Sequence, residues 1–227
     1  MLLLGLANIH YCVTISSGEC GLLFCCAHTL NKSGVDFLPY SERIDKDGLT
    51  EAEFLKNYSS DKYPKPSLTA DVIIIAKAGD TRRVLLIKRG GHPYLGCWAF
   101  PGGFANMGES IEQTAQRELL EETGIKGIAL TPVGFFSKPG RDPRGWVVTR
   151  TFLAQTESEL PAKAADDAQD ARWFDLEQEE SRVKLTCGNE LIEFSYSDKP
   201  ITVTPLSEQR MAFDHAEMLV TALKMII

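Results

Sequence analysis

The sequence predicts an α+β fold in which several strands surround one functional helix. Short runs of apolar, β-branched residues alternate with Gly, Pro and Asp, as expected for strands joined by turns. One stretch, residues 103–125, carries five glutamates, some of them at helical spacing. With 44% hydrophobic and 24% charged side chains, the 227 residues suffice for one large domain or one domain with an appendage.

An N-terminal appendage, residues 1–62, is expected to precede the main domain, residues 63–227. The boundary is Tyr63-Pro64-Lys65-Pro66, because this proline pair interrupts regular structure. The sequence of the appendage does not indicate its role. Its predicted elements are strands over residues 10–16 and 21–27 and a short helix over residues 50–58.

The main domain begins with a predicted β-hairpin. Residues 68–77 and 83–88 are apolar and β-branched, and Gly79-Asp80-Thr81 between them has turn chemistry. Ser207 is expected to cap a final helix that continues to about residue 225. Further strands are predicted over residues 128–137, 146–155 and 171–174, and a second hairpin over residues 185–194 and 200–204.

Residues 1–13 are apolar, yet they favour neither a secretory signal nor a membrane span. No Lys or Arg precedes Lys32, and the apolar run is too short to cross a bilayer. The six cysteines form no regular framework, so we expect free thiols in a reducing cytoplasm. Zinc binding is the alternative for the N-terminal group, although it contains no C-x2-C pair: Cys12, Cys20, Cys25, Cys26 and His28.

The formal net charge of −7 argues against broad electrostatic binding to nucleic acid or to anionic membranes. An anionic substrate would therefore depend on bound cations and on a few local arginines. We expect a cytoplasmic protein with a small-molecule substrate and with no nucleic-acid or membrane partner.

The acidic segment over residues 103–125 is the strongest candidate for a functional site. Glu118, Glu121 and Glu122 share one helix face through i, i+3 and i, i+4 spacing. Arg117 is the only basic residue within residues 103–125, so we expect no internal partner to neutralise these charges and a multivalent cation to compensate them. A solvated charged face is the alternative, but such faces usually interleave Lys at i+4.

Turn and cap residues mark both ends of the acidic helix. Gly102 and Gly103 permit a tight turn in which the backbone approaches a ligand closely. Ser110 or Glu109 is placed near the start of the helix. Gly124 is placed where a left-handed cap would end it.

The acidic segment resembles the signature of the Nudix hydrolase family, G-x5-E-x7-R-E-U-x-E-E-x-G-U, where U is aliphatic. Including the preceding strands and Pro101-Gly102-Gly103, the resemblance extends from residue 68 to the C-terminus and leaves out residues 1–60. The matching positions are Gly103, Glu109, Arg117, Glu118, Leu119, Glu121, Glu122, Gly124 and Ile125.

The resemblance implies a Nudix fold, in which a mixed β-sheet is sandwiched between helices and a loop-helix-loop carries the signature. It also implies Mg2+ or Mn2+ bound by Glu118, Glu121 and Glu122 together with the Gly103 carbonyl, since hard cations prefer oxygen ligands. The reaction would be attack of water on a diphosphate linked to another group. The metal would lower the pKa of the water, and a carboxylate would take its proton.

The resemblance implies supporting residues as well. Arg117 would orient a neighbouring glutamate, Glu109 would support the helix through a salt bridge, and Glu112 would be solvated. Family members often bring an extra carboxylate to the metals from a loop. Asp167 is the preferred match and Asp166 the second, with a solvated acidic loop as the alternative.

A basic loop, residues 137–146, narrows the choice of substrate. Arg141 and Arg144 flank Asp142-Pro143, and arginine can grip phosphate oxygens bidentately. An ordinary turn with solvated charges is the alternative. The sequences GRDPRG and MAFDHAE resemble the ADP-ribose pyrophosphatase branch of the family. This resemblance implies hydrolysis of ADP-ribose to AMP and ribose 5-phosphate, with Arg141, Asp142 and Arg144 in substrate binding.

Other side chains are candidates for the same site. Arg89 precedes a Gly-Gly loop and is a candidate to bind phosphate, with a charged strand end as the alternative. Asp214 and His215 could form a catalytic pair, but helix packing and capping are the favoured interpretation. Three aromatic residues could stack on adenine, with burial in the core as the alternative: Trp98, Phe104 and Trp146.

Several functions compete with ADP-ribose hydrolysis. Another dinucleotide such as NADH, or a nucleotide sugar, is the nearest alternative, whereas a nucleoside triphosphate would leave the basic loop without a role. A non-catalytic Nudix-type transcriptional regulator is a different class. It is disfavoured because the signature keeps every glutamate and residues 180–227 lack a basic recognition helix. Enzymes of this branch are commonly homodimers, which implies a homodimer here.

Overall fold

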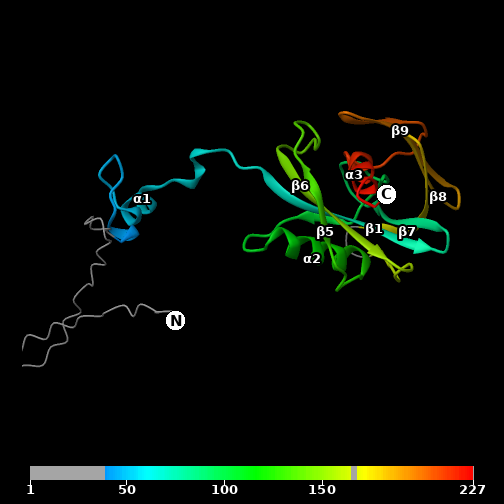
Figure 1. The fold of residues 1–227 in the computed structure, drawn as a ribbon, viewed down its shortest axis with the longest axis horizontal. Helices are drawn as coiled ribbons and strands as arrows, with labels where there is room; N and C mark the ends of the chain where they lie inside the picture. The colour runs from blue at the N-terminus through cyan, green and yellow to red at the C-terminus, as the bar shows by residue number, and fades with distance from the viewer. Residues whose placement is uncertain (1–38, 165–167, 227) are drawn as a thin grey trace, which may run out of the picture. The chain divides into compact units, whose positions relative to one another are not determined.

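The computed structural model describes residues 39–164 and 168–226. Internal contacts divide the chain into two units, Met1–Lys62 and Tyr63–Ile227, which are treated separately (Figure 1). Some predicted features lie outside the described residues. They are the strands over residues 10–16 and 21–27, the candidate zinc ligands Cys12, Cys20, Cys25, Cys26 and His28, and the carboxylates Asp166 and Asp167.

The described part of the first unit contains one α-helix, α1 (Glu51–Asn57), and two 3-10 turns, η1 (Tyr40–Glu42) and η2 (Ser60–Lys62). A capping box begins α1: the Thr50 hydroxyl accepts a hydrogen bond from Glu53 N–H, and the Glu53 carboxylate accepts one of 2.9 Å from Thr50 N–H. None of these elements has a buried residue. The short helix predicted for this unit is confirmed.

The second unit is built on one mixed, ten-stranded sheet (Figure 1). Eight strands follow the order β10-β9-β8-β7-β2-β1-β6-β5, while β3 pairs with β2 and β4 pairs with β1. Strands β1 and β6 run parallel, and the other pairs are antiparallel. The strands are β1 (Ser67–Ala78), β2 (Thr81–Arg89), β3 (Trp98–Ala99), β4 (Gly102–Phe104), β5 (Thr131–Phe136), β6 (Val147–Thr156), β7 (Ala168–Glu179), β8 (Arg182–Cys187), β9 (Glu190–Asp198) and β10 (Ile201–Pro205).

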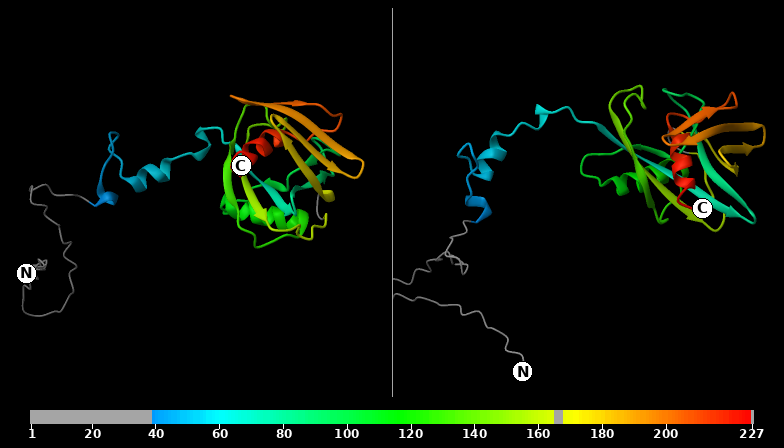
Figure 2. Two further views of the ribbon diagram at one scale, coloured as in Figure 1. Left: turned by 45° about the vertical axis from the view of Figure 1, so that its right-hand side comes forward. Right: turned by 45° about the horizontal axis from the view of Figure 1, so that its top comes forward.

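Helices cover both faces of this sheet. Alternate residues of β1 point to opposite faces, as the two-residue period of a strand requires. Val72 and Ile74 share a cluster with residues of α2 (Ile111–Thr123), whereas Ile73 shares one with residues of α3 (His215–Leu223). The strands β8 to β10 curve over α3 (Figure 2), and β8 and β9 add apolar residues to its cluster. The prediction of a mixed sheet sandwiched between helices is confirmed.

The predicted hairpin of the main domain is also confirmed. Residues 68–77 and 83–88 lie in β1 and β2, which pair around a turn at Gly79 and Asp80. The predicted strand over residues 171–174 is the centre of the longer β7.

The second predicted hairpin is confirmed in part, because β9 and β10 pair as antiparallel neighbours, but the bounds of its first strand and the start of the final helix are wrong. Residues 185–194 do not form one strand, because Gly188 adopts φ +60° and turns the chain between β8 and β9. The final helix does not begin at Ser207, whose hydroxyl instead accepts a hydrogen bond of 2.8 Å from Glu193 N–H in β9. Met211 forms a parallel β-bridge with Trp98 of β3, so the chain before α3 is extended beside the sheet and not helical.

Cys97 and Cys187, the two cysteines among the described residues, are free thiols as predicted. Within residues 39–164 and 168–226, no helix has the length and apolar character needed to cross a membrane.

Candidate active site

Residues 100–103, called the glycine turn below, bring the main chain against α2. The Gly102 N–H donates a hydrogen bond of 2.8 Å to the Glu122 carboxylate. A Cβ on Gly103 would lie 2.5 Å from Cδ of Glu118, and one on Gly102 would meet the backbone of β1 at 2.3 Å. Glycine at 103 therefore leaves room for the Glu118 carboxylate, and glycine at 102 permits the close approach of the turn to β1.

Both ends of α2 follow from local sequence. Ser110 and Gln113 form a capping box: Gln113 N–H donates to the Ser110 hydroxyl at 3.2 Å, and Ser110 N–H donates to the Gln113 side chain at 2.8 Å. Gly124 ends the helix in the left-handed conformation, with φ +75°. The predicted helix ends are confirmed, and Glu112 is exposed as predicted.

One arginine neutralises much of the acidic cluster. The Arg117 Nε donates to Glu109 at 2.7 Å, and its Nη1 donates to Glu118 at 2.6 Å. The same Nη1 lies 2.8 Å from Glu121, and Nη2 donates to the Phe104 carbonyl at 2.8 Å. The expectation that no internal partner neutralises the glutamates is therefore wrong, because a guanidinium offers five donors in one plane. The hydrogen bond from Arg117 lowers the pKa of Glu109 to about 2.

Burial disfavours negative charge on the two carboxylates nearest the glycine turn. Glu122 is only 8% exposed, and desolvation raises its pKa to about 8 against the opposing effect of the Gly102 N–H. Desolvation also raises the pKa of Glu118, although Arg117 opposes this shift. Because a buried carboxylate is costly without a compensating charge, this face of α2 favours a bound cation.

The donor chemistry of α2 fits a hard divalent cation, although its side chains do not form a closed metal centre. Among the residues that the structure describes, no group of three or more His, Cys, Asp or Glu side chains is placed to hold a metal ion. Arg117 holds Glu118 and Glu121, while Gly102 holds Glu122. The donor set still suits such a cation, because three carboxylates of one helix supply the oxygen ligands that hard divalent cations prefer.

The two arginines of the basic loop have different contacts. Arg141 is buried, and its Nε and Nη2 donate to the two carboxylate oxygens of Asp214 at 2.8 and 2.6 Å. Arg144 is exposed, donates to Asp142 at 2.7 Å, and lies 4.7 Å above the ring of Phe104. The alternative interpretation of the basic loop, an ordinary turn with solvated charges, is therefore wrong for Arg141. Both arginines line the cavity and both are held in ion pairs, Arg141 with Asp214 and Arg144 with Asp142, but only Arg144 is exposed.

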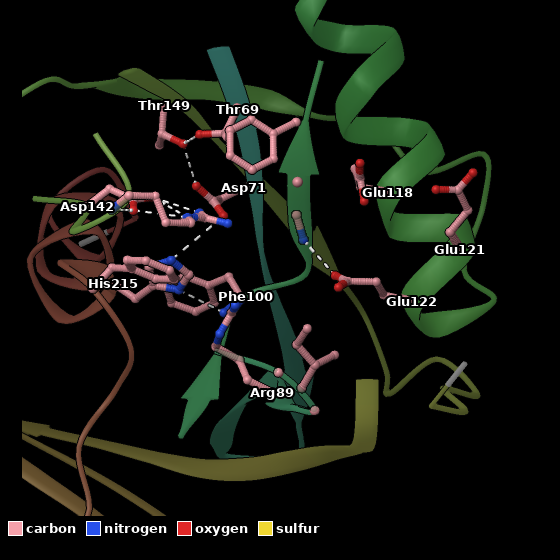
Figure 3. Close-up of a pocket in the computed structure, with 18 of the residues that line it drawn as sticks. Thr69, Asp71, Arg89, Phe100, Glu118, Glu121, Glu122, Asp142, Thr149 and His215 are labelled. Atoms are coloured by element: carbon pink, nitrogen blue, oxygen red, sulfur yellow. Dashed lines mark hydrogen bonds and ion pairs between the residues drawn. The ribbon is translucent and has the colours of Figure 1, made fainter. Parts of the chain in front are cut away.

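The glycine turn, α2, the basic loop and the start of α3 surround a cavity of about 450 Å³. Figure 3 shows Glu118 and Glu122 on the α2 side and Asp142 and His215 across from them. The structure brings ten of the predicted site residues to this cavity: Arg89, Gly103, Phe104, Arg117, Glu118, Glu121, Glu122, Arg141, Asp142 and Arg144.

Arg89, at the end of β2, turns its side chain toward the cavity. Its Nε donates to the Pro93 carbonyl at 2.9 Å, and its guanidinium lies 5.1 Å from the centre of the Phe213 ring. Burial lowers the pKa of Arg89, and the like charge of Arg144 adds to this shift. The neighbouring Lys88 instead pairs with Glu190 at 3.2 Å.

The sequence reasoning missed a polar group on the floor of the cavity. Asp71 of β1 is buried and accepts a hydrogen bond of 2.7 Å from the Thr149 hydroxyl, which also contacts the hydroxyl of Thr69. His215 Nε2 lies 3.7 Å from Asp71. One signal was available, because Asp71 is a carboxylate within an otherwise apolar predicted strand, and such residues are rarely buried without a partner.

Helix packing is confirmed for His215, which is 3% exposed, whereas the predicted capping by Asp214 is wrong. His215 Nδ1 accepts a hydrogen bond of 2.9 Å from Phe100 N–H, and its ring stacks on the Phe100 ring at 5.3 Å. Asp214 occupies the N-cap position of α3 but makes no side-chain cap bond, because its carboxylate binds Arg141. Both residues therefore connect α3 to the walls of the cavity.

The buried His215 should make stability sensitive to acid. Burial lowers its pKa below the ordinary value of 6.5; Asp71 and Asp214 oppose this shift, while Arg141 and Arg89 add to it. The unfolded chain then binds a proton as the pH falls below about 6.5 while the folded chain does not, so stability is lost until the lower, folded-state pKa is reached. Urea unfolding at about pH 7.5 and about pH 5.5 should show a larger loss for the wild type than for His215→Phe. Equal losses would contradict a neutral, buried His215.

The three candidate aromatic residues differ in exposure. Trp98 is 1% exposed and packs edge-on against Phe174, with ring centres 4.8 Å apart. Phe104 is 41% exposed and lines the cavity, whereas Trp146 is 57% exposed. Burial in the core is thus correct for Trp98 and wrong for Phe104 and Trp146.

Comparison with known proteins places this geometry in a family. Residues 66–189 match the family model of the NUDIX domain. An ADP-ribose pyrophosphatase of Methanocaldococcus jannaschii is 42% identical over 138 residues, which span 60% of this chain and 74% of that protein. The ADPR responsive transcriptional repressor NtrR of Acinetobacter baylyi is 34% identical over 131 residues, which span 57% of this chain and 52% of that protein.

A solved structure agrees with these relatives. The NUDIX domain of Shewanella oneidensis NrtR, crystallised with ADP ribose, aligns with a TM-score of 0.59 and 27% identity. The alignment covers 79% of this chain and 100% of that domain.

Proposed function

We propose a substrate and a metal for this chain, which belongs to the NUDIX domain family and is a Nudix pyrophosphohydrolase. The substrate is ADP-ribose, the products are AMP and ribose 5-phosphate, and the metal is Mg2+ or Mn2+. The observation that carries this proposal is the cavity of about 450 Å³, in which Glu118 and Glu122 share the walls with Arg89 and Arg144. The relative from Methanocaldococcus jannaschii supports the choice of substrate.

The proposed metal ligands are the carboxylates of α2. Glu118, Glu121 and Glu122 would hold the cation together with the Gly103 carbonyl. When bound, the cation lowers the pKa of a water molecule and offsets charge that develops on phosphate oxygens. Arg117 stays beside these carboxylates through its two hydrogen bonds to Glu109, at 2.7 and 3.2 Å. Glu109 and Arg117 therefore position the metal ligands.

The proposed substrate contacts are Arg89, Arg144 and Phe104, which line the same cavity as the α2 carboxylates. Arg89 and Arg144 bind diphosphate oxygens, since guanidinium groups match them in charge and geometry. Phe104 offers an exposed aromatic face beside Arg144, at 4.7 Å. Arg141 and Asp142 act on the substrate through the position of the loop, because they are held by Asp214 at 2.6 Å and by Arg144 at 2.7 Å.

A substrate panel tests this assignment. We expect kcat/KM with Mg2+ to be highest for ADP-ribose, the substrate named for the relative from Methanocaldococcus jannaschii, and lower for NADH and for ADP-glucose. ATP should also be hydrolysed more slowly, because its phosphate chain carries a sugar at one end only. Faster hydrolysis of ATP than of ADP-ribose would contradict the substrate. No Mg2+-dependent turnover of any compound would contradict the enzyme.

A regulator that binds ADP-ribose without hydrolysing it is the second candidate, favoured by the similarity to the repressor of Acinetobacter baylyi. The signature keeps all its glutamates, Glu109 before α2 and Glu118, Glu121 and Glu122 on it, which supports hydrolysis instead. Calorimetric binding of ADP-ribose with no turnover in the panel would favour the regulator.

Two further features stay predictions. Asp167, the candidate extra carboxylate, lies outside the described residues. A homodimer is expected from the resemblance alone, and the molecular mass in solution would test it.

A further inference from the structure

Three consecutive residues before and at the start of α3 each contact a different part of the cavity wall: Phe213, Asp214 and His215. They lie outside residues 66–189, which match the family model. Their position follows from the preceding residues, because Ala212 N–H donates to the Trp98 carbonyl at 2.8 Å. This hydrogen bond draws the segment along β3, directly before the glycine turn.

His215 contacts the glycine turn. Its Nδ1 accepts the Phe100 N–H at 2.9 Å, and the two rings are stacked with an interplanar angle of 6°. His215 is 3% exposed, so water cannot readily replace this bond. Phe100 is two residues before Gly102, whose N–H binds Glu122. A fixed Phe100 backbone therefore fixes the donor that faces α2.

Asp214 contacts the basic loop. Its carboxylate accepts two hydrogen bonds from Arg141, and the two side chains are 11% and 4% exposed. Asp142, the next residue of the loop, accepts hydrogen bonds from both the backbone N–H and the guanidinium of Arg144. The position of Arg144 thus depends on a loop that is anchored to α3.

Phe213 contacts two arginines that line the cavity, Arg89 and Arg144. Its ring lies 5.1 Å from the Arg89 guanidinium and 5.4 Å from that of Arg144. Its φ of +51° is unfavourable for a residue other than glycine, and such strain persists only where surrounding contacts hold it. Phe213 and Arg141 also line a second cavity of about 340 Å³. The strained residue therefore places an aromatic ring beside Arg89 and Arg144.

We propose that Phe213, Asp214 and His215 form a positioning unit that sets the glycine turn and the basic loop relative to each other. His215 positions the catalytic side, and Asp214 positions the substrate side. The two contacts are made by separate side chains to separate elements. Loss of the His215 contact should leave the Asp214 contact in place, and the reverse. One loss should therefore change mainly kcat and the other mainly KM. The assignment of the two sides rests on the proposed function.

Two substitutions separate the contacts. His215→Phe keeps a stacking ring but removes the acceptor for the buried Phe100 N–H. We expect kcat for ADP-ribose to fall about 10- to 100-fold, because small displacements of catalytic groups are costly, with KM within about threefold. Asp214→Asn leaves the Arg141 charge without its partner. We expect KM to rise about 10-fold or more, with kcat within about threefold.

Matched variants test whether these effects are specific. His215→Asn supplies an acceptor oxygen at the position of Nδ1 and should restore kcat to within about fivefold of the wild type. Met218→Leu changes a buried residue of α3 that lines neither cavity, and Asp198→Asn removes the partner of Lys224 at the other end of α3. Both controls should leave kcat and KM unchanged.

Mn2+ binding, followed by electron paramagnetic resonance, tests the unit without turnover. His215→Phe should weaken Mn2+ binding about 10-fold, and Asp214→Asn should change it less than about twofold. Equal kinetic losses in the two variants, no rescue by His215→Asn, or unchanged Mn2+ affinity in His215→Phe would overturn the positioning unit. Absence of ADP-ribose turnover by the wild type would contradict only the proposed function, because the Mn2+ measurements would still decide the positioning claim.

Discussion

Replacing Glu122 with Gln is expected to lower kcat for ADP-ribose by about 10²- to 10⁴-fold, the range typical for loss of a catalytic carboxylate. Glu122 faces the glycine turn at 2.8 Å and is 8% exposed. Gln keeps an oxygen that can accept the Gly102 N–H but cannot supply a negative charge. Because burial already disfavours the charge of Glu122, the folded state should lose no stability in the variant.

The matched control is Glu112→Gln, which makes the same chemical change on an exposed residue of the same helix. Steady-state kinetics and urea unfolding of the two variants provide the comparison. A Glu122→Gln enzyme with nearly wild-type kcat would contradict the role of α2, and an equal loss in Glu112→Gln would show that the effect is not specific to the site.

Adding a single methyl group at each glycine of the turn should have two different outcomes. In Gly103→Ala, the new Cβ would meet the end of the Glu118 side chain at 2.5 Å. A flexible side chain can move away, so the fold should be retained, but the displaced carboxylate should lower kcat about 10²-fold. In Gly102→Ala, the new Cβ would meet Ala70 O at 2.3 Å and the Asp71 Cα at 2.8 Å. Because backbone cannot move away in the same manner, we expect a loss of about 1–3 kcal/mol in the free energy of unfolding.

Gly134→Ala in β5 is the control, since its Cβ would meet only the Phe136 ring at an ordinary 3.8 Å. It should leave both kcat and unfolding unchanged. Thermal unfolding and kcat measured on all three alanine variants distinguish a loss of activity from a loss of stability. Full activity in Gly103→Ala, or a greater loss of stability in Gly103→Ala than in Gly102→Ala, would contradict the geometry of the glycine turn.

Features set by neighbouring residues could be predicted from the sequence. The hairpin of β1 and β2 depends on β-branched runs around Gly79-Asp80, and α2 depends on caps at Ser110 and Gly124. The acidic face of α2 likewise depends on spacing within one helix. These signals lie within a few residues of the structure that they specify, so they can be recognised without tertiary information.

Features set by distant contacts could not be predicted. The hydrogen bond between Phe100 and His215 joins residues 115 apart in sequence, and the one between Arg141 and Asp214 joins residues 73 apart. The start of α3 was misplaced for the same reason. Residues before it have helix-compatible side chains, but the bond between Ala212 and Trp98 holds them along β3.

Quantifying AMP and ribose 5-phosphate formed from ADP-ribose tests most directly whether the α2 carboxylates and the glycine turn make a metal-dependent hydrolytic centre. Three samples suffice: wild type with Mg2+, wild type with EDTA, and Glu122→Gln with Mg2+. We expect the two products in equal amounts from the first sample and almost none from the other two. Product formation that persists undiminished in EDTA or in Glu122→Gln would contradict this centre, whereas no AMP from the wild type with Mg2+ would contradict the proposed substrate.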